Sequence, residues 1–187
     1  MIKIEGNELK TLMEFCNPPM KDENCRRDIY LRVCNAGTCI IAVGLSGYRL
    51  HKILIPITET DFEDSKELLI PYFKVPKEYL NEEITIEFNE NNYVIFSYEN
   101  GSTKLELKNT DIRDFNRVDD LFKHDSTFEI AIKAKYLMQM AKAIQDKDKD
   151  AIVKLEFTDA VSPIFCKDTG EDNREVLLLP VRLNHNL

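Results

Sequence analysis

Hydrophobic and polar residues alternate along most of the chain with the period of two that half-buried β-strands show. Segment 28–34 is the clearest case, because the apolar residues Ile29, Leu31 and Val33 are separated by more polar ones. Similar alternation or short apolar runs predict further strands at 1–5, 39–43, 50–57, 68–71, 84–88, 93–97, 103–107, 128–132, 152–157, 162–166 and 176–183.

Two segments instead repeat apolar residues at the three- and four-residue spacing of an amphipathic helix. The first helix is expected to end at Pro18, because proline interrupts helical hydrogen bonding. A shorter helical piece is predicted near 75–80, where Pro76 weakens the pattern. The apolar faces consist of Leu9, Leu12, Met13 and Cys16 in the first helix and Leu137, Met140, Ala141 and Ile144 in the last.

These elements recur in one order, a strand, a helix and three strands, with a period of about sixty residues. We therefore expect three half units, at 1–60, 61–120 and 121–187. The first two would form one domain, 1–120, and the third would stand beside it. The predicted fold class is α+β, with antiparallel sheets and the helices on one side.

The segment 43–50 interrupts the longest apolar run with a tight turn. Gly44 and Gly47 bracket Ser46, and Tyr48 and Arg49 follow side by side. An aromatic residue next to an arginine is typical of surfaces that bind a partner, and an ordinary solvated hairpin is the alternative. Ser46 has no base at a recognisable spacing, and the chain has no catalytic motif, so we do not expect an enzyme.

Composition excludes some classes of protein. The 187 residues are 43% hydrophobic, enough for a substantial core, and the formal net charge of -8 excludes a surface that is basic all over. A local basic stripe is predicted on the last helix, at Lys135, Gln139 and Lys142, with a merely solvated helix face as the alternative. Lys10 lies on the first helix, and Lys74 and Lys77 flank the second helical piece.

The remaining chemistry is sparse. Neither an export signal nor an apolar run long enough for a membrane is present in the sequence, so we expect a cytoplasmic location and no membrane partner. Cys34 and Cys39 flank a turn and are expected to face each other, as reduced thiols in that compartment. The three histidines lack neighbours at metal-ligand spacing, so no metal and no cofactor is expected.

Four fragments, in this order, resemble the β subunit of bacterial DNA polymerase III, the sliding clamp. Segment 44–50 is similar to the Ala-Thr-Asp-Gly-His/Tyr-Arg-Leu turn of that family, with Leu45 and Ser46 in place of the threonine and aspartate. Segment 111–118 resembles its Gly-x-Phe-Pro-Asp-Tyr-x-x-Val link, segment 158–162 a loop that follows, and segment 177–183 its terminal Met-Pro-Met/Val-Arg-Leu. The resemblance implies a shortened member with the sliding-clamp fold, in which 1–120 is a clamp-like domain of the central type and 121–187 resembles the C-terminal half of the last clamp domain.

The resemblance also implies a pocket for short peptides of DNA polymerases and clamp loaders. Apolar side chains would hold Leu and Phe anchors of the peptide, and arginines would pair with polar groups at the rim. A plain core strand is the alternative for 177–181. By matching position, one wall would be Ile29, Leu45, Gly47, Tyr48, Arg49 and Leu50, with Arg117 and Val118 at the link, and the other Val161, Leu177, Leu179, Pro180, Val181, Arg182 and Leu183.

The implied function is that of a processivity factor that tethers replication proteins to DNA. Its helices would face double-stranded DNA without reading the sequence, through Lys10, Lys74, Lys77, Lys135, Gln139 and Lys142. A homo-oligomer is expected, because a ring of twelve such half units would need about four chains. The alternative function is a peptide-binding module that does not encircle DNA and regulates or decoys clamp-binding proteins.

Overall fold

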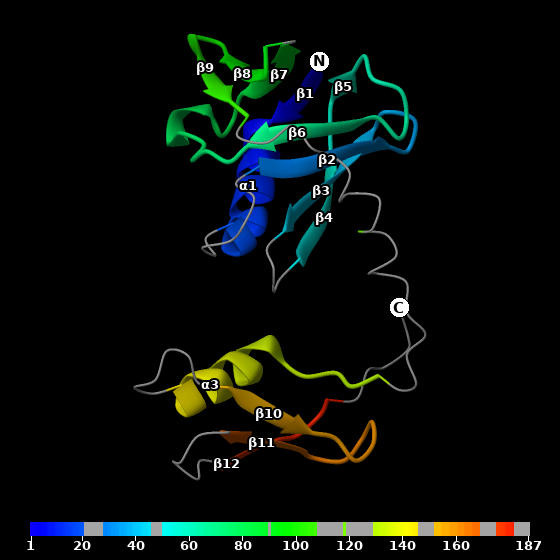
Figure 1. Ribbon diagram of the computed structural model, residues 1–187, viewed down its shortest axis with the longest axis vertical. Coiled ribbons are helices and arrows are strands. Elements are labelled where there is room, and N and C mark those ends of the chain that lie inside the picture. The colour runs from blue at the N-terminus through cyan, green and yellow to red at the C-terminus, as the bar shows by residue number, and fades with distance from the viewer. Residues whose placement is uncertain are drawn as a thin grey trace. The chain divides into compact units, whose positions relative to one another are not determined.

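The computed structural model describes residues 1–20, 28–45, 50–89, 91–107, 118, 129–145, 152–168 and 175–181. The chain divides into two compact units, Met1–Phe122 and Lys123–Leu187, called unit 1 and unit 2 below. Each unit is described by itself (Figure 1).

Unit 1 contains two antiparallel sheets that share one hydrophobic core. One sheet has the strand order β5-β1-β7-β8-β9 and the other β4-β3-β2-β6. Helix α1 packs against β3 and β4 (Figure 1). The elements are β1 (Ile2–Glu5), α1 (Gly6–Met20), β2 (Asp28–Cys34), β3 (Cys39–Leu45), β4 (Leu50–Pro56), β5 (Glu59–Thr60), β6 (Glu67–Pro71), the 3-10 helix η1 (Lys77–Tyr79), β7 (Glu83–Asn89), β8 (Tyr93–Tyr98) and β9 (Gly101–Glu106).

The two halves of unit 1 exchange their first strands. Strand β1 of the first half pairs with β7 of the second, and β6 of the second half pairs with β2 of the first. Ile4 lies opposite Ile84 in one of these pairings and Ile29 opposite Ile70 in the other, and all four side chains are fully buried. The exchange makes the two halves into one folding unit, because neither half completes its sheet alone.

Helix α1 does not end at the first proline, as the sequence predicted, but continues through Pro18 and Pro19 to Met20. The prediction failed because a donor from outside the helix compensates for a missing amide. Pro19 has no N–H to give to the carbonyl four residues earlier, that of Phe15. The Nδ1 atom of His51 lies 2.7 Å from this carbonyl oxygen and takes the place of the absent donor.

The second helical piece, predicted near 75–80, is a single 3-10 turn at Lys77–Tyr79. Pro76 precedes it with an extended backbone and no side-chain cap. The turn is fixed by packing, because the ring of Tyr79 stacks on Tyr98 with the centroids 4.1 Å apart.

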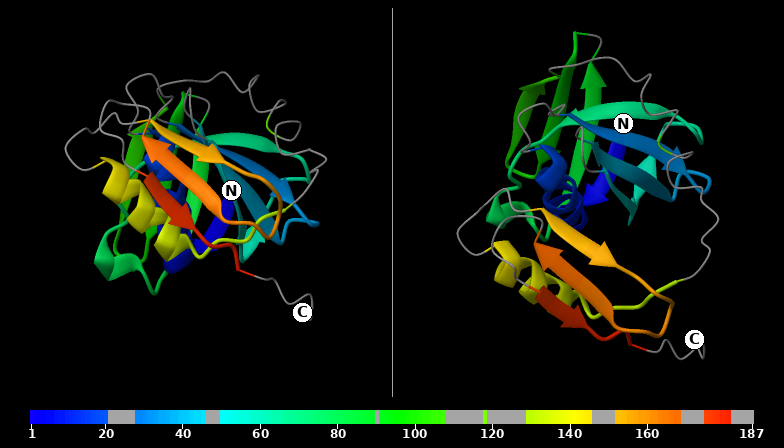
Figure 2. Two further views of the ribbon diagram at one scale, coloured as in Figure 1. Left: turned by 90° about the horizontal axis from the view of Figure 1, so that it is seen from below. Right: turned by 60° about the horizontal axis from the view of Figure 1, so that its bottom comes forward.

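In the described residues of unit 2, helix α3 lies on one face of an antiparallel sheet with the order β10-β11-β12 (Figure 2). Its elements are α3 (Ala134–Gln145), β10 (Val153–Glu156), β11 (Ile164–Asp168) and β12 (Glu175–Leu178). The small core between helix and sheet consists of Met140, Ile164, Cys166 and Leu178.

Two strand predictions for unit 2 need correction. Of the strand expected at 128–132, the described residues 129–132 form no regular strand, although the amide of Val181 donates to the carbonyl of Ala131 at 2.8 Å. The strand expected at 176–183 ends at Leu178, because Pro180 follows and has no amide for a ladder.

Within the described ranges, the helices are all too short or too polar to cross a lipid bilayer.

Candidate functional site

Strand β12 of unit 2 presents apolar side chains on both of its faces. Leu178 is 7% exposed and faces α3, whereas Leu177 and Leu179 are 49% and 65% exposed. Phe165 of β11 lies opposite Leu177 and is exposed as well. A plain core strand would bury these side chains, so that alternative is excluded for Leu177 and Leu179.

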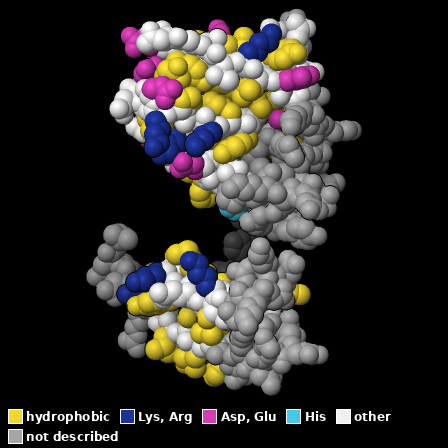
Figure 3. All heavy atoms as spheres, turned by 90° about the vertical axis from the view of Figure 1, so that its left-hand side faces the viewer, with side chains coloured by type: hydrophobic (Ala, Val, Ile, Leu, Met, Phe, Trp, Pro, Cys, Tyr) yellow, Lys and Arg dark blue, Asp and Glu magenta, His cyan; other side chains and the backbone are white. Residues whose placement is uncertain are grey.

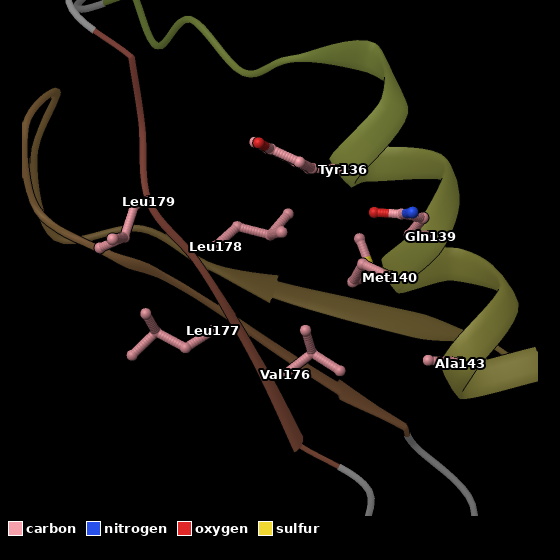
Figure 4. A pocket seen from close by; sticks show the side chains of 8 residues that line it. All are labelled: Tyr136, Gln139, Met140, Ala143, Val176, Leu177, Leu178 and Leu179. Atoms are coloured by element: carbon pink, nitrogen blue, oxygen red, sulfur yellow. The ribbon is translucent and has the colours of Figure 1, made fainter.

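A groove of ≈ 410 Å³ runs between α3 and β12, and we call it the α3–β12 groove. Figure 4 shows Val176 and Leu178 pointing toward the helix, and Leu177 and Leu179 pointing to the other side of the strand. The groove is therefore continuous with the exposed apolar surface of the sheet. Its lining consists of Tyr136, Gln139, Met140, Ala143, Val176, Leu177, Leu178 and Leu179.

The size of one helical residue explains why this groove is open. Ala143 is the tenth residue of α3, and Phe15 is the tenth residue of α1. In unit 1 the ring of Phe15 packs against His51 of the neighbouring strand, with the ring centroids 5.3 Å apart. Because alanine has only a methyl group, α3 places no ring at the corresponding position of unit 2, where Ala143 lines the groove.

Val161 lies on a loop held by one carboxylate. Asp159 accepts hydrogen bonds from the amides of Val161 at 2.8 Å and Ser162 at 2.6 Å, and from the Ser162 hydroxyl at 2.7 Å. These hydrogen bonds lower the pKa of Asp159, and the bond from the Ser162 hydroxyl has the largest effect. The loop presents Val161 with 73% of its surface exposed, and its contact with a peptide stays a prediction.

A small ion-pair network lies beside the apolar surface. Glu156 of β10 pairs with Lys154 at 2.9 Å and with Lys167 at 3.8 Å. The hydrogen bond and charge of Lys154, followed by the charge of Lys167, lower the pKa of Glu156. Since Glu156 lies opposite Phe165, the network forms a polar border next to Phe165 and Leu177.

In unit 1 the structure brings together part of the predicted first wall. Leu45 lies opposite Leu50 at the end of the β3–β4 hairpin where the two strands are connected. Leu50 packs against a cluster of buried side chains on the outer face of the sheet, and Val118 of the predicted link belongs to this cluster. The cluster consists of Tyr30, Val43, Leu69 and Val118.

The prediction for Ile29 is wrong. Ile29 is fully buried in the interior of unit 1, on the opposite face of β2 from this cluster, and is not available to a ligand. Successive strand residues point to opposite faces, so a shift of one residue, to Tyr30, gives the side chain on the outer face. Other predicted residues lie outside the described part of the chain, namely Gly47, Tyr48, Arg49, Arg117, Arg182 and Leu183.

Close contact with α1 fixes the position of this hairpin near its connected end, at Gly44. A Cβ atom on Gly44 would lie 2.4 Å from the carbonyl oxygen of Cys16, so only glycine fits there. Burial raises the pKa of the Cys16 thiol to about 12, and the thiol therefore stays protonated at neutral pH.

The lysines predicted to face DNA lie on the helical layers of the two units. Lys10, Lys74 and Lys77 line one groove of ≈ 370 Å³ between α1 and the segment 72–80, together with Glu14, which pairs with Lys10 at 3.8 Å. Lys135 and Lys142 are exposed on α3. Figure 3 shows basic side chains near acidic ones on unit 1 and beside apolar ones on unit 2.

Gln139 lies on the exposed side of α3, where it was predicted to face DNA. The structure also makes it a lining residue of the α3–β12 groove, together with Leu177 and Leu179. Pro180 and Val181, predicted beside them, are half-buried at the end of the same segment. Sequence reasoning missed the other helical lining residues, although Tyr136, Met140 and Ala143 have the spacing of one helix face.

Cys34 and Cys39 face each other across their turn, as predicted, with the sulfur atoms of the two free thiols 2.8 Å apart. Burial, followed by the hydrogen bond with Cys39, raises the pKa of the Cys34 thiol to about 12. The two side chains lie at the turn end of the β2–β3 hairpin.

Solved structures share this arrangement along almost the whole chain. A protein from Eubacterium rectale assigned as a DNA polymerase III beta subunit matches with a TM-score of 0.72 over 96% of this chain, at 17% identity. The chain has the sliding-clamp fold. The DNA polymerase beta subunit of Streptococcus pyogenes has 12% identity and a TM-score of 0.55 over 95% of the chain, and the Helicobacter pylori beta clamp bound to a DNA ligase peptide has 16% and 0.51 over 96%.

The match to sliding clamps covers only part of their length. This chain corresponds to 50% of the E. rectale protein, 52% of the S. pyogenes protein and 55% of the H. pylori protein, so it spans about half of each. No protein-family model matches the sequence, and neither does any curated protein. At these identities the comparison establishes the sliding-clamp fold, and the function has to be argued from the surfaces.

Proposed function

We propose that this chain is a clamp-like processivity factor that tethers replication proteins to DNA by binding their short apolar peptides. The observation that carries the proposal is the exposure of Leu177 and Leu179 beside the α3–β12 groove. Exposed leucines around a groove are the surface that accepts Leu or Phe anchors of a peptide. The H. pylori clamp, solved with a DNA ligase peptide, supports this role for the fold.

The groove offers both parts of a peptide site. Its floor is apolar, with Met140, Ala143 and Leu178, and Tyr136 and Gln139 bring polar groups to its helical side. Desolvating the apolar floor supplies affinity, while the hydroxyl and amide groups hold the peptide backbone or polar side chains in register. The role needs no catalytic group.

DNA binding would use the helical layers. Lys74 and Lys77 in unit 1 and Lys135 and Lys142 in unit 2 provide positive charge in a chain whose formal net charge is -8. Contacts of this kind are made to phosphates and do not depend on base sequence, so binding should weaken steeply with salt. Several copies would be required to surround a duplex.

A peptide titration tests the proposal. A fluorescent peptide with Leu and Phe anchors, taken from a bacterial DNA polymerase III, is titrated with the full chain while amide spectra of the protein are recorded. We expect saturable binding, with the largest shifts at 161 and 176–181. Absence of binding, or shifts confined to unit 1, would reject the α3–β12 groove as the peptide site.

The second candidate is a peptide-binding module that does not encircle DNA. The observation that favours it is the pairing of Glu14 with Lys10 at 3.8 Å, which offsets positive charge on the helical layer of unit 1. Retention on covalently closed circular DNA distinguishes the two functions, since only a ring stays on closed circles and slides off linear DNA. Peptide binding without this difference supports the module.

A further inference from the structure

Unit 2 repeats the strand order of the first half of unit 1 and one of its backbone hydrogen bonds. In unit 1 the amide of Thr58, which lies between β4 and β5, donates to the carbonyl of Lys3 at 2.9 Å. In unit 2 the amide of Val181 donates in the same way to Ala131 at 2.8 Å. Lys3 and Ala131 each lie three residues before their helix, so segment 130–133 corresponds to β1 and α3 to α1.

The two halves differ in what completes their sheets. In unit 1 the second half pairs with β1 through β7 and with β2 through β6. By position in the sheet, β10 corresponds to β2. In the part of the chain that the structure describes, no strand pairs with segment 130–133 in the manner of β7, or with β10 on the edge away from β11. Unpaired edges of this kind are templates for pairing with another chain.

Among the described residues of unit 2, several apolar side chains around these two edges are exposed. Leu9 of α1 is fully buried, whereas Leu137, at the same position of α3, is 40% exposed. Met138, the next residue, is 59% exposed, and its counterpart Lys10 lines the groove against the second half of unit 1. On the sheet, Ile152, Leu155 and Phe157 are exposed as well.

We propose that unit 2 docks against unit 2 of a second copy of this chain. Each copy would add segment 130–133 to the β10 edge of the other, as the two halves of unit 1 exchange β1 and β6. A second copy is the expected occupant because unit 2 carries both the donor segment and the acceptor edge, which is the self-complementarity that a two-fold interface requires. The inference rests on the half-unit architecture and is independent of the proposed peptide binding.

This interface leaves the α3–β12 groove open. On α3, Leu137 and Met138 point away from the side of the helix that carries Tyr136, Gln139 and Ala143, given 100° of rotation per residue. On the sheet, the pairing edge is β10, and the groove lies along β12, the opposite edge. Dimerisation and peptide binding can therefore be separated by substitutions.

The mass of the full chain in solution, measured by light scattering and sedimentation over a range of concentrations, tests the proposal. We expect a dimer at about 100 μM chain, and a rise in its Kd of at least about 100-fold for Met138→Glu and for Leu155→Lys, since each dimer would bury two unpaired charges. Both side chains are partly exposed in the single copy, so the variants should fold. Hydrogen exchange should show amides of 153–156 becoming protected as the dimer forms.

Two control variants change exposed leucines outside the proposed interface. Leu54→Glu changes a side chain that is 57% exposed in unit 1, and Leu177→Asp changes the groove, so both variants should dimerise with the Kd of the parent chain. A chain that stays monomeric at about 100 μM, or a dimer that neither Met138→Glu nor Leu155→Lys weakens, would overturn the proposal. Protection of 153–156 only after another protein is added would overturn it too.

Discussion

Phe165 and Leu177 lie directly opposite each other on β11 and β12, and both remain about half exposed, at 44% and 49%. Their strand neighbours, Cys166 and Leu178, are buried under α3. An apolar cross-strand pair on the outer face of so small a sheet adds little to the core of unit 2 and is available to a partner. This pair is the basis for placing ligand binding on β12.

Gly44 should be irreplaceable in unit 1. We expect Gly44→Ala to lower the free energy of unfolding by about 2 to 3 kcal/mol, because the new methyl group would collide with the backbone of Cys16 and could not be relieved by a side-chain rotation. Urea denaturation followed by circular dichroism measures the change. Gly101→Ala is the control, since a Cβ atom there meets nothing within 4 Å, and an equal loss in the two variants would contradict the packing argument.

His51 should stabilise the end of α1. We expect His51→Ala to cost about 1 to 2 kcal/mol, because the Phe15 carbonyl loses a hydrogen-bond donor that Pro19 cannot replace and the Phe15 ring loses its neighbour. Thermal unfolding gives the cost. His51→Gln retains an N–H donor and should recover part of the stability. Equal stabilities of His51→Ala and His51→Gln would show that the hydrogen bond to Phe15 does not stabilise α1.

The loop that carries Val161 should respond to acid. The pKa of Asp159 is lowered in the folded chain, so its hydrogen bonds contribute fully above the ordinary pKa of an aspartate and are lost as the pH falls through the lowered one. Amide shifts of Val161 and Ser162 should therefore be constant from neutral pH down to the ordinary aspartate range and change below it. Asp159→Asn should abolish this transition, and a transition that persists in that variant would assign it to another group.

The helical layer should determine DNA binding. We expect the pair Lys135→Glu and Lys142→Glu to weaken binding to duplex DNA by about tenfold or more at low salt, with a smaller salt dependence, because fewer phosphates are neutralised. Fluorescence anisotropy with duplexes of unrelated sequence measures both quantities. Lys66→Glu with Lys104→Glu, two exposed lysines outside helices, changes the net charge equally. If the two double variants weaken DNA binding equally, the loss is a general effect of net charge and α3 is not the DNA-binding surface.

The positions of the strands could be predicted from the sequence, because hydrophobic and polar residues alternate in a strand that has one face on a core. Segment 28–34 was predicted with the bounds of β2, and the spacing of Met140 located α3. The course of α1 beyond Pro18 depended on His51, which comes from a strand distant in sequence. Local patterns carry no information on such a donor, so this feature could not be predicted.

The sequence indicated which segments carry the candidate site, but it did not indicate which face of each strand the side chains lie on. The resemblance indicated Leu177 in β12 and Leu179 directly after it, and the side chains of both are exposed. Ile29 failed because a shift of one residue reverses the face of a strand. The groove itself was missed because it depends on the small size of Ala143 next to β12, a contact between elements that no spacing along the chain reveals.

The central claim is that the surface around Leu177 binds replication peptides. Its most direct test compares the affinity of one polymerase-derived peptide for Leu177→Asp and for Leu54→Asp, which alters a similarly exposed leucine of unit 1. We predict a loss of at least about 30-fold for Leu177→Asp and none for Leu54→Asp, with both variants folded. Unchanged affinity in Leu177→Asp, or equal losses in the two variants, would contradict the proposed function of this surface.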